Sequence, residues 1–218
     1  MMNILLASQS PRRRELIKLL NLPFEAISVD ADEDSIQDKD LKANVQARAR
    51  LKAATFASTY ERSTQLIIGA DTAVSLNNQL LNKPTSPTHA KEMLTALRGQ
   101  RHEVHSGVVL LNPQRGINIA FVNTAVVTMR SFTENEINAY IETGDPLDKA
   151  GGYAIQHPVF KPVSQLDGCF LSVMGFPVCQ LILELKKINI SVQFAYDQLQ
   201  QAHENYPICP QLSELVNP

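Results

Sequence analysis

The chain has 218 residues, of which 44% are hydrophobic and 19% are charged, and its formal net charge is −2. This composition is typical of a folded globular protein, and the length suits one large domain or two lobes that share a core. The small negative charge excludes a global field that attracts nucleic acid, and no apolar run is long enough to span a membrane. We therefore expect neither a stable nucleic-acid complex nor a membrane partner.

The start of the chain and its cysteines indicate the compartment. The N-terminus lacks the basic start and long apolar core of a signal peptide. Cys169, Cys179 and Cys209 are odd in number and have no CxxC spacing, which favours neither a disulfide framework nor a zinc site. We therefore expect a cytoplasmic protein.

Apolar patterns in the first two thirds of the chain predict alternating strands and helices. Strands are expected at 3–7, 24–29, 66–68 with its continuation 73–76, 103–111 and 117–132. Helices are expected from Pro11 to before Pro23 with Ser10 as N-cap, and over 44–60, 88–98, 133–144 and 177–187. This order favours an α/β protein with a mixed sheet, in which the loops after strands hold ligands.

The last third is less regular. Residues 145–156 predict a loop with a short strand, and Val192–Asn205 is an amphipathic stretch that predicts an added helix. We expect one catalytic domain over 1–190 and a partly helical C-terminal extension over 191–218.

The stretch "ASQSPRRREL", residues 7–16, places Arg12, Arg13 and Arg14 in the first turn of a helix. That end of a helix already carries positive charge, so the arrangement costs stability unless an anion binds. With the hydroxyls of Ser8 and Ser10, it predicts a phosphate or carboxylate site. The alternative is a solvated basic turn with one arginine paired to Glu15.

Two carboxylates suggest chemistry beside this anion site. Asp71 follows "IIGA" at the end of a buried strand, where it can hold Mg²⁺ or orient a water, although a capping role in a turn fits equally well. Glu33 lies in an acidic run that by itself reads as a solvated face. From the residues alone, Asp71 is therefore the candidate catalytic and metal-binding residue.

Lysines complete a mixed-charge cleft. Lys52, Lys83 and Lys149 are candidates to contact phosphates, although each alone is more often a surface lysine. His102 and His105 have no third partner at ligand spacing, so we interpret them as structural or surface residues. Neither a Walker A motif nor a GxGxxG is present, which gives no support to the usual ATPase and dinucleotide folds.

Four motifs in order, "LLASQSPRRREL", "IIGADTAV", "NKP" and "DPLDKAGGYAIQ", resemble those of the Maf family of nucleoside triphosphate pyrophosphatases. The resemblance extends from about residue 3 to "SVMGFP" and the helix after it. It implies hydrolysis of a nucleoside triphosphate to a monophosphate and pyrophosphate, aided by Mg²⁺ or Mn²⁺. It also implies an elongated mixed α/β fold with two lobes around a cleft, similar to inosine triphosphate pyrophosphatases, and a homodimer.

The resemblance also assigns residues. Ser8, Ser10, Arg12 and Arg13 match the loop that grips the phosphates, and Lys52 and Lys83 match phosphate-contacting lysines. Glu33 falls where the family has a metal-binding or catalytic acid, and Asp71 matches the proton acceptor. The second loop is matched by Asp148, Lys149 and Gln156.

Three positions of the motifs differ between branches of the family. Arg12, Thr72 and Gln156 resemble the branch that takes dTTP and UTP rather than the branch that prefers 7-methyl-GTP. The loop after Gln156 departs from the branch pattern, with His157 and Pro158 in place of a glycine-containing segment. Because we expect this loop to border the base pocket, the preference for pyrimidines stays open.

Two other functions compete. Another phosphate-ester activity, such as that of a phosphatase or nucleotidyltransferase, would differ in the product released. A nucleotide-binding regulator of cell division or septum formation would bind a triphosphate without significant turnover.

Overall fold

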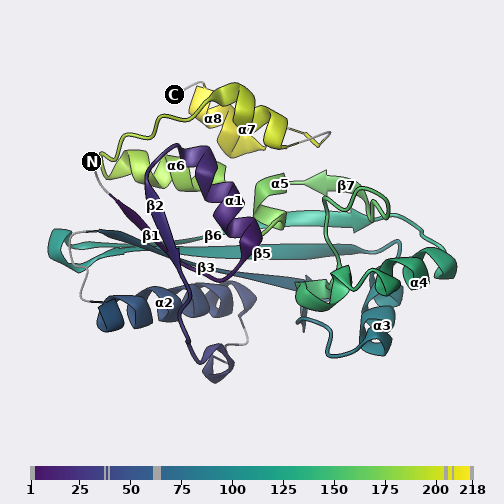
Figure 1. Cartoon of the computed structure of the whole chain (residues 1–218). Helices are drawn as coiled ribbons and strands as arrows, with labels where there is room; N and C mark the ends of the chain where they lie inside the picture. The colour runs from purple at the N-terminus through teal and green to yellow at the C-terminus, as the bar shows by residue number, and fades with distance from the viewer. Residues whose placement is uncertain are drawn as a thin grey trace.

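A mixed sheet forms the centre of the computed structural model, which describes residues 3–36, 38, 40–60, 65–203, 206–207 and 209–216 (Figure 1). Its strand order is β2-β1-β3-β5-β6-β7, with β4 paired to β3 outside this path. β1 runs parallel to β2 and β3, and the remaining pairs are antiparallel. The strands are β1 (Ile4–Ala7), β2 (Phe24–Ile27), β3 (Leu66–Leu76), β4 (Gln79–Leu81), β5 (Arg101–Asn112), β6 (Ile117–Met129) and β7 (Val163–Asp167).

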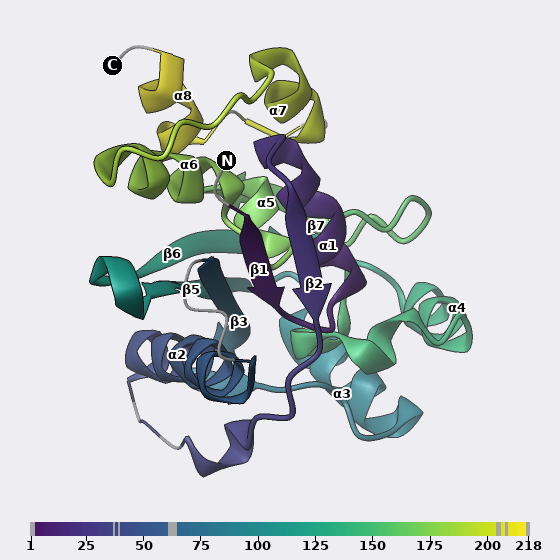
Figure 2. The same ribbon diagram turned by 60° about the vertical axis from the view of Figure 1, so that its left-hand side comes forward.

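Helices cover both faces of the sheet, which confirms the predicted α/β class (Figure 2). α2 lies on one face, α1, α5 and α6 lie on the other, and α3 and α4 lie together at one end of the molecule (Figure 1). The helices are α1 (Pro11–Ile17), α2 (Leu41–Tyr60), α3 (Pro87–Leu97), α4 (Glu134–Glu142), α5 (Phe170–Val173), α6 (Val178–Lys187), α7 (Tyr196–Ala202) and α8 (Pro210–Val216). None of the helices in these described ranges combines the length and the apolar character that crossing a bilayer requires.

Local capping fixes several of these helices as the sequence predicts. Ser10 caps α1 by accepting a hydrogen bond from the Arg13 backbone N–H, with Pro11 in the first turn. Thr133 and Glu136 form a capping box at the start of α4, where the sequence predicts a helix from residue 133.

The prediction differs from the structure in three segments. Residues 145–156 hold two 3₁₀ helices, Asp145–Asp148 and Ala150–Gly152, and no strand, because Gly151 and Gly152 have φ of 71° and 70°. β7 was not predicted, since only Leu166 is buried in this short edge strand. The helix expected over Val192–Asn205 spans only Tyr196–Ala202, and positions 204 and 205 lie outside the described residues.

Two glycines let α2 approach the sheet closely. Ala49, Ala53 and Phe56 are fully buried against the sheet, as their spacing predicts. A Cβ at Gly69 would lie 2.1 Å from the Ala49 carbonyl oxygen, and one at Gly107 would lie 2.8 Å from a backbone oxygen of the same helix. This close packing brings the middle of α2 against the middle of β3.

His102 gives the fold a pH dependence. The side chain is buried on β5, with Nε2 2.7 Å from Tyr153 Oη, and burial lowers its pKa from 6.5 to about 4. The unfolded chain therefore takes up this proton before the native state does, so stability falls as the pH drops from 6.5 toward 4. We expect a loss of about 2 kcal/mol between pH 7 and pH 5 from this group.

The measurement is urea unfolding of the wild type and His102→Gln at both pH values, with His89→Gln as the matched change on α3. The difference in the free energy of unfolding between pH 7 and pH 5 should become smaller only in His102→Gln. Equal differences in all three proteins would assign the pH dependence to other groups.

Candidate active site

The turn between β1 and α1 is built by its own polar side chains. Ser8 Oγ accepts a hydrogen bond from the Ser10 backbone N–H at 3.2 Å, and Ser10 Oγ accepts one from the Arg13 backbone N–H at 3.4 Å. Ser8 is buried and Ser10 is half-buried. The two predicted phosphate-binding serines therefore already shape the loop that would receive an anion.

Arg13 is the buried member of the arginine run. Its Nε donates to the Gly175 carbonyl at 2.9 Å, and its Nη2 donates to Thr72 Oγ1 at 3.0 Å. Nη1 donates to the Ala70 carbonyl at 2.9 Å and to Ser8 Oγ at 3.5 Å. The guanidinium thus ties α1 to β3 and to the turn that follows α5.

Burial and neighbouring charges act on Arg13 in opposite directions. Burial lowers its pKa, while the negative charges of Asp71 and Glu33 act to raise it. Arginine stays protonated under all ordinary conditions, so the positive charge persists inside the protein. The two acids balance this buried charge.

The Ala70 carbonyl is available because β1 is short. The pairing of β1 with β3 ends at Ala7 and Gly69, so β3 continues past its neighbour. The Ala70 oxygen, one residue further on, accepts from Arg13 Nη1 and from Lys52 Nζ at 3.4 Å. Beyond the carboxyl end of β1, β3 therefore no longer pairs with this strand, and the side chains of Arg13 and Lys52 occupy the space.

Lys52 joins the two candidate acids. Its ammonium lies 2.8 Å from Asp71 Oδ1 and 2.8 Å from Glu33 Oε2. Lys52 and Asp71 are buried, whereas 37% of the Glu33 side chain is exposed. Asp71 is predicted from its place after a buried strand and Glu33 from the family resemblance, and the structure brings the two acids together through the lysine on α2.

The other two arginines have different surroundings. Arg12 is half-buried and has no hydrogen-bond partner within the part of the chain that the structure describes. Arg14 is exposed, and Glu15 pairs with Lys18 at 2.7 Å rather than with an arginine. The three adjacent side chains of Arg12, Arg13 and Arg14 are thus half-buried, buried and exposed, as their different directions around the helix require.

The second loop is packed on β3 beyond Asp71. A Cβ at Gly151 would lie 2.9 Å from Val74 Cγ1, and the Gly151 backbone N–H donates to the Asn82 carbonyl at 3.2 Å. The exposed Lys83 follows Asn82 directly. The "NKP" motif and the "DKAGG" motif are therefore neighbours in space.

Lys149 is buried within this loop. Its ammonium donates to Asp145 Oδ1 at 2.8 Å and also contacts the exposed carboxylate of Asp148. Burial raises the pKa of Asp145, but hydrogen bonds from Lys149 and Tyr140 outweigh this effect and lower it. Lys149 therefore links two acids of the same loop.

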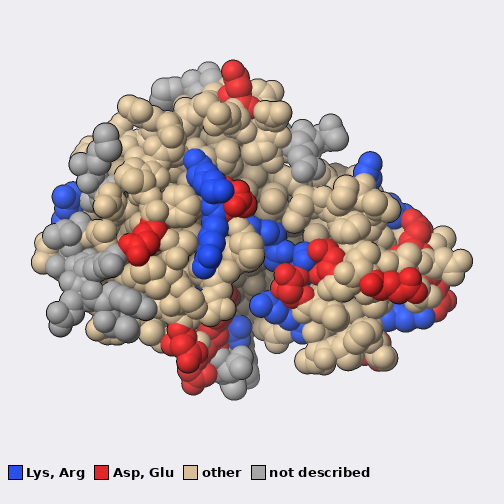
Figure 3. Space-filling model, viewed as in Figure 1, with Lys and Arg blue, Asp and Glu red and all other residues tan. Residues whose placement is uncertain are grey.

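Charged side chains line a hollow in the surface. Figure 3 shows Lys and Arg together with Asp and Glu in the hollow between the body that carries α1 and the part that carries α3 and α4. Within the described residues, no hydrogen bond connects Arg12, Lys83, Lys149 or Gln156 to the group formed by Arg13, Lys52 and Asp71. These predicted residues lie outside the hydrogen-bonded network.

Two residues that sequence reasoning missed complete the network around Thr72. Gly175 has φ of 104°, and its carbonyl accepts from Thr72 Oγ1 at 3.3 Å as well as from Arg13. Ser106 Oγ lies 3.1 Å from Thr72 Oγ1 and donates to the Ser172 carbonyl at 2.8 Å. The glycine in "SVMGFP" was the only local signal for this contact.

Comparison with known proteins places these motifs in a wider group. A model of Maf-like proteins matches residues 3–188. The dTTP/UTP pyrophosphatase of Bacillus cytotoxicus is 39% identical over 195 residues, which cover 89% of this chain and 100% of that protein. The dTTP/UTP pyrophosphatase of Chlorobium phaeovibrioides is 39% identical over 189 residues, or 85% of this chain and 97% of that protein. Among solved structures, a HAM1 protein from Coxiella burnetii has 16% identity and a TM-score of 0.47 over 86% of this chain and 100% of that chain.

Proposed function

Because this chain belongs to the Maf family, we propose that it is a nucleoside triphosphate pyrophosphatase, which hydrolyses the triphosphate to a monophosphate and pyrophosphate. The observation that carries the proposal is the ion-paired group of Asp71, Lys52 and Glu33 beside the arginine-bearing turn. The names of the relatives, dTTP/UTP pyrophosphatase, support the same activity. Turnover of a free triphosphate is what separates this enzyme from a nucleotide-binding regulator.

Each residue has a proposed part. Asp71 accepts a proton from water as the water oxygen bonds to the α-phosphorus, and the bond to the bridging oxygen breaks so that pyrophosphate leaves. The turn with Ser8, Ser10, Arg12 and Arg13 binds the phosphates, and the lysines Lys52, Lys83 and Lys149 add positive charge, with Asp148 keeping Lys149 in place. These cations stabilise the leaving pyrophosphate.

A divalent cation fits the acids of this site. Glu33 and Asp71 present carboxylate oxygens, the donors that Mg²⁺ and Mn²⁺ take in proteins. When bound, such an ion neutralises part of the negative charge on the phosphates.

The bond that breaks can be read from isotope placement. In ¹⁸O-water, attack at the α-phosphorus puts the label into the monophosphate and leaves pyrophosphate unlabelled. Mass spectrometry of the products from UTP and dTTP gives the result. Label found only in inorganic phosphate or pyrophosphate would contradict the proposed reaction.

We place dTTP and UTP first among the substrates, as nucleotide-pool housekeeping. Arg12, Thr72 and Gln156 match the branch with this preference, while the loop from His157 onward differs from it. Rates on a panel of nucleoside triphosphates, with Mg²⁺ and with Mn²⁺, test both the base and the metal.

Variants of Arg12 and Arg14 should distinguish a residue that selects the base from a residue that only adds surface charge. Arg12 is half-buried without a hydrogen-bond partner among the described residues, so Arg12→Ala should change the ranking of UTP, dTTP, GTP and CTP in kcat/KM. Arg14 is exposed, and Arg14→Ala should change kcat/KM less than about twofold, as expected for one screened surface charge. Equal losses in both variants would mean that the arginines act as a diffuse patch.

Compartment and assembly extend the proposal. The three cysteines are free in the structure, which suits the reducing cytoplasm where we place the protein. The family resemblance further suggests a homodimer, which light scattering during gel filtration tests.

A further inference from the structure

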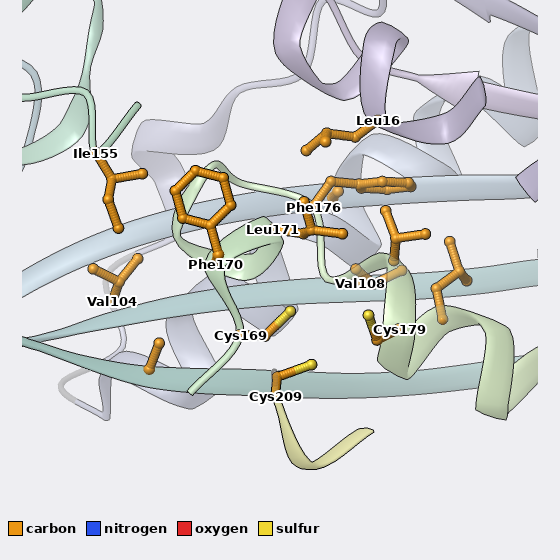
Figure 4. Packing of buried hydrophobic residues seen from close by; sticks show 14 of the residues in the cluster. Leu16, Val104, Val108, Ile155, Cys169, Phe170, Leu171, Phe176, Cys179 and Cys209 are labelled. Carbon is orange, nitrogen blue, oxygen red and sulfur yellow. The ribbon is translucent and has the colours of Figure 1, made fainter. Parts of the chain in front are cut away.

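We propose that Cys169, Cys179, His203 and Cys209 form a zinc site, separate from the candidate active site. Their ligand atoms all lie within 4.8 Å of one another. Each of the four residues is at most 1% exposed. Figure 4 shows the sulfur atoms of Cys169, Cys179 and Cys209 directed toward a common point among the buried hydrophobic residues. Three thiols and one imidazole converging on one buried point make up a complete set of structural zinc ligands.

The distances between the histidine nitrogen and the cysteine sulfurs fit a shared metal better than direct hydrogen bonds. His203 Nε2 lies 3.6 Å from Cys169 Sγ and 3.9 Å from Cys179 Sγ. In tetrahedral zinc sites, bonds of about 2.3 Å to sulfur and about 2.0–2.1 Å to nitrogen place neighbouring ligand atoms roughly 3.4–3.8 Å apart. Small movements of these side chains therefore suffice to close the site around an ion.

The imidazole is oriented as a ligand by its second nitrogen. His203 Nδ1 lies 2.7 Å from the Leu199 carbonyl oxygen, which can only accept a hydrogen bond. Nδ1 therefore carries the hydrogen, and Nε2 directs its lone pair at the sulfurs. A backbone carbonyl that fixes the tautomer in this way is the usual outer partner of a metal-bound histidine.

The four residues come from two parts of the chain. Cys169 precedes α5 and Cys179 lies in the first turn of α6, within the range that the Maf model matches. His203 follows α7 and Cys209 precedes α8, beyond that range. One ion would thus fasten the proposed C-terminal extension to the catalytic domain.

The other contacts of the described extension with the domain are mainly apolar. α7 and α8 have seven residues each, and they bury Leu199, Leu212 and Leu215 in the main core cluster. The Tyr206 ring stacks on Phe170 with the ring centres 4.9 Å apart. A bound ion would add a rigid link to this apolar packing, which gives it a structural role.

The ligand spacing explains why the sequence argued against zinc. Nine residues separate the first two cysteines and five separate His203 from Cys209, so no CxxC or HxxxH signature arises. The ligands meet only because four short helices pack together. The soft sulfur-rich set selects zinc, whereas the oxygen set of Glu33 and Asp71 suits Mg²⁺ or Mn²⁺.

The first test is the metal content of the purified full-length protein. After gel filtration with a chelator that removes weakly held ions, we expect one zinc per chain by inductively coupled plasma mass spectrometry. Asp71→Asn should keep this zinc, because the candidate active site lies elsewhere. Replacement of zinc by added cobalt chloride should produce the intense visible bands of tetrahedral cobalt bound to thiolate.

Variants then assign the ligands. Cys209→Ser and His203→Gln should lose most of the zinc and the cobalt bands, while His89→Gln should keep both. Since a ligand variant could fail to fold, the wild-type result decides. Protein without stoichiometric zinc whose three thiols all react after denaturation would overturn the site, and so would a mass lower by two hydrogens, which marks a disulfide.

Discussion

Asp71→Asn should leave the protein folded and reduce kcat by roughly 10²–10⁴, the usual cost of removing a general base. The amide keeps the shape of the side chain and can still accept from Lys52, which also retains Glu33 at 2.8 Å. The substitution removes the negative charge that we propose takes the proton from water and helps to hold a cation. Steady-state kinetics on UTP and dTTP measure the loss, and circular dichroism verifies the fold.

Asp167→Asn is the matched control, because it makes the same change at an exposed position at the end of β7. Its kcat should equal that of the wild type. Glu33→Gln should slow turnover by a smaller factor than Asp71→Asn, since its side chain is partly exposed and water can replace some of its contacts. A folded Asp71→Asn protein with near-normal kcat would reduce Asp71 to a structural residue of β3.

Arg13→Ala should affect stability and activity together. It removes one donor from each of the Gly175 and Ala70 carbonyls, which keep only the longer contacts from Thr72 and Lys52, and it leaves Lys52 as the remaining buried positive charge beside Asp71 and Glu33. Losing a hydrogen bond to a charged group costs about 1.5–3 kcal/mol. Urea unfolding should show this loss, and kcat/KM should fall by a similar factor for UTP, dTTP, GTP and CTP, because a phosphate contact carries no base information.

Arg13→Lys should recover little of either property. A lysine restores the charge but has no planar fork with which to reach Gly175 and Thr72 at once. Arg14→Ala serves as the control, with stability and kinetics close to those of the wild type. Losses confined to one base, or an Arg13→Ala protein as stable as the wild type, would contradict the role assigned to this network.

Local features of the fold were predictable because short-range physics determines them. The Ser10 cap, the apolar face of α2 and the capping box of α4 each depend on residues within one or two helical turns. β7 was missed because an edge strand with one buried residue has no clear alternation. The 3₁₀ helices after Gly144 replace the expected strand because positive φ at adjacent glycines breaks an extended chain.

The candidate site divides in the same way. The arginine turn and Asp71 were predicted from their places at strand ends and Glu33 from the family resemblance, but the pairing of the acids with Lys52 was not predicted. Gly175 lies 162 residues from Arg13, and no local pattern encodes that contact. Lys52 was predicted to meet phosphate, and the structure pairs it with Asp71 and Glu33, so its phosphate role remains a proposal. The cysteine and histidine cluster depends on how separate helices pack, which spacing along the chain does not reveal.

The length difference between β1 and β3 determines how Asp71, the proposed catalytic carboxylate, is held. Asp71 lies past the end of β1, yet its backbone remains paired with Gly107 of β5 on the other side. Asp71 therefore lies on a strand rather than on a loop. At this position the strand is paired with β5 on one edge and is no longer paired with β1 on the other. Little reorganisation is needed when a triphosphate arrives, because the acid moves only as the sheet does. Amide hydrogens of β3 around Asp71 should exchange with deuterium far more slowly than those of the serine- and arginine-bearing turn, which leaves adaptation to the substrate to that turn.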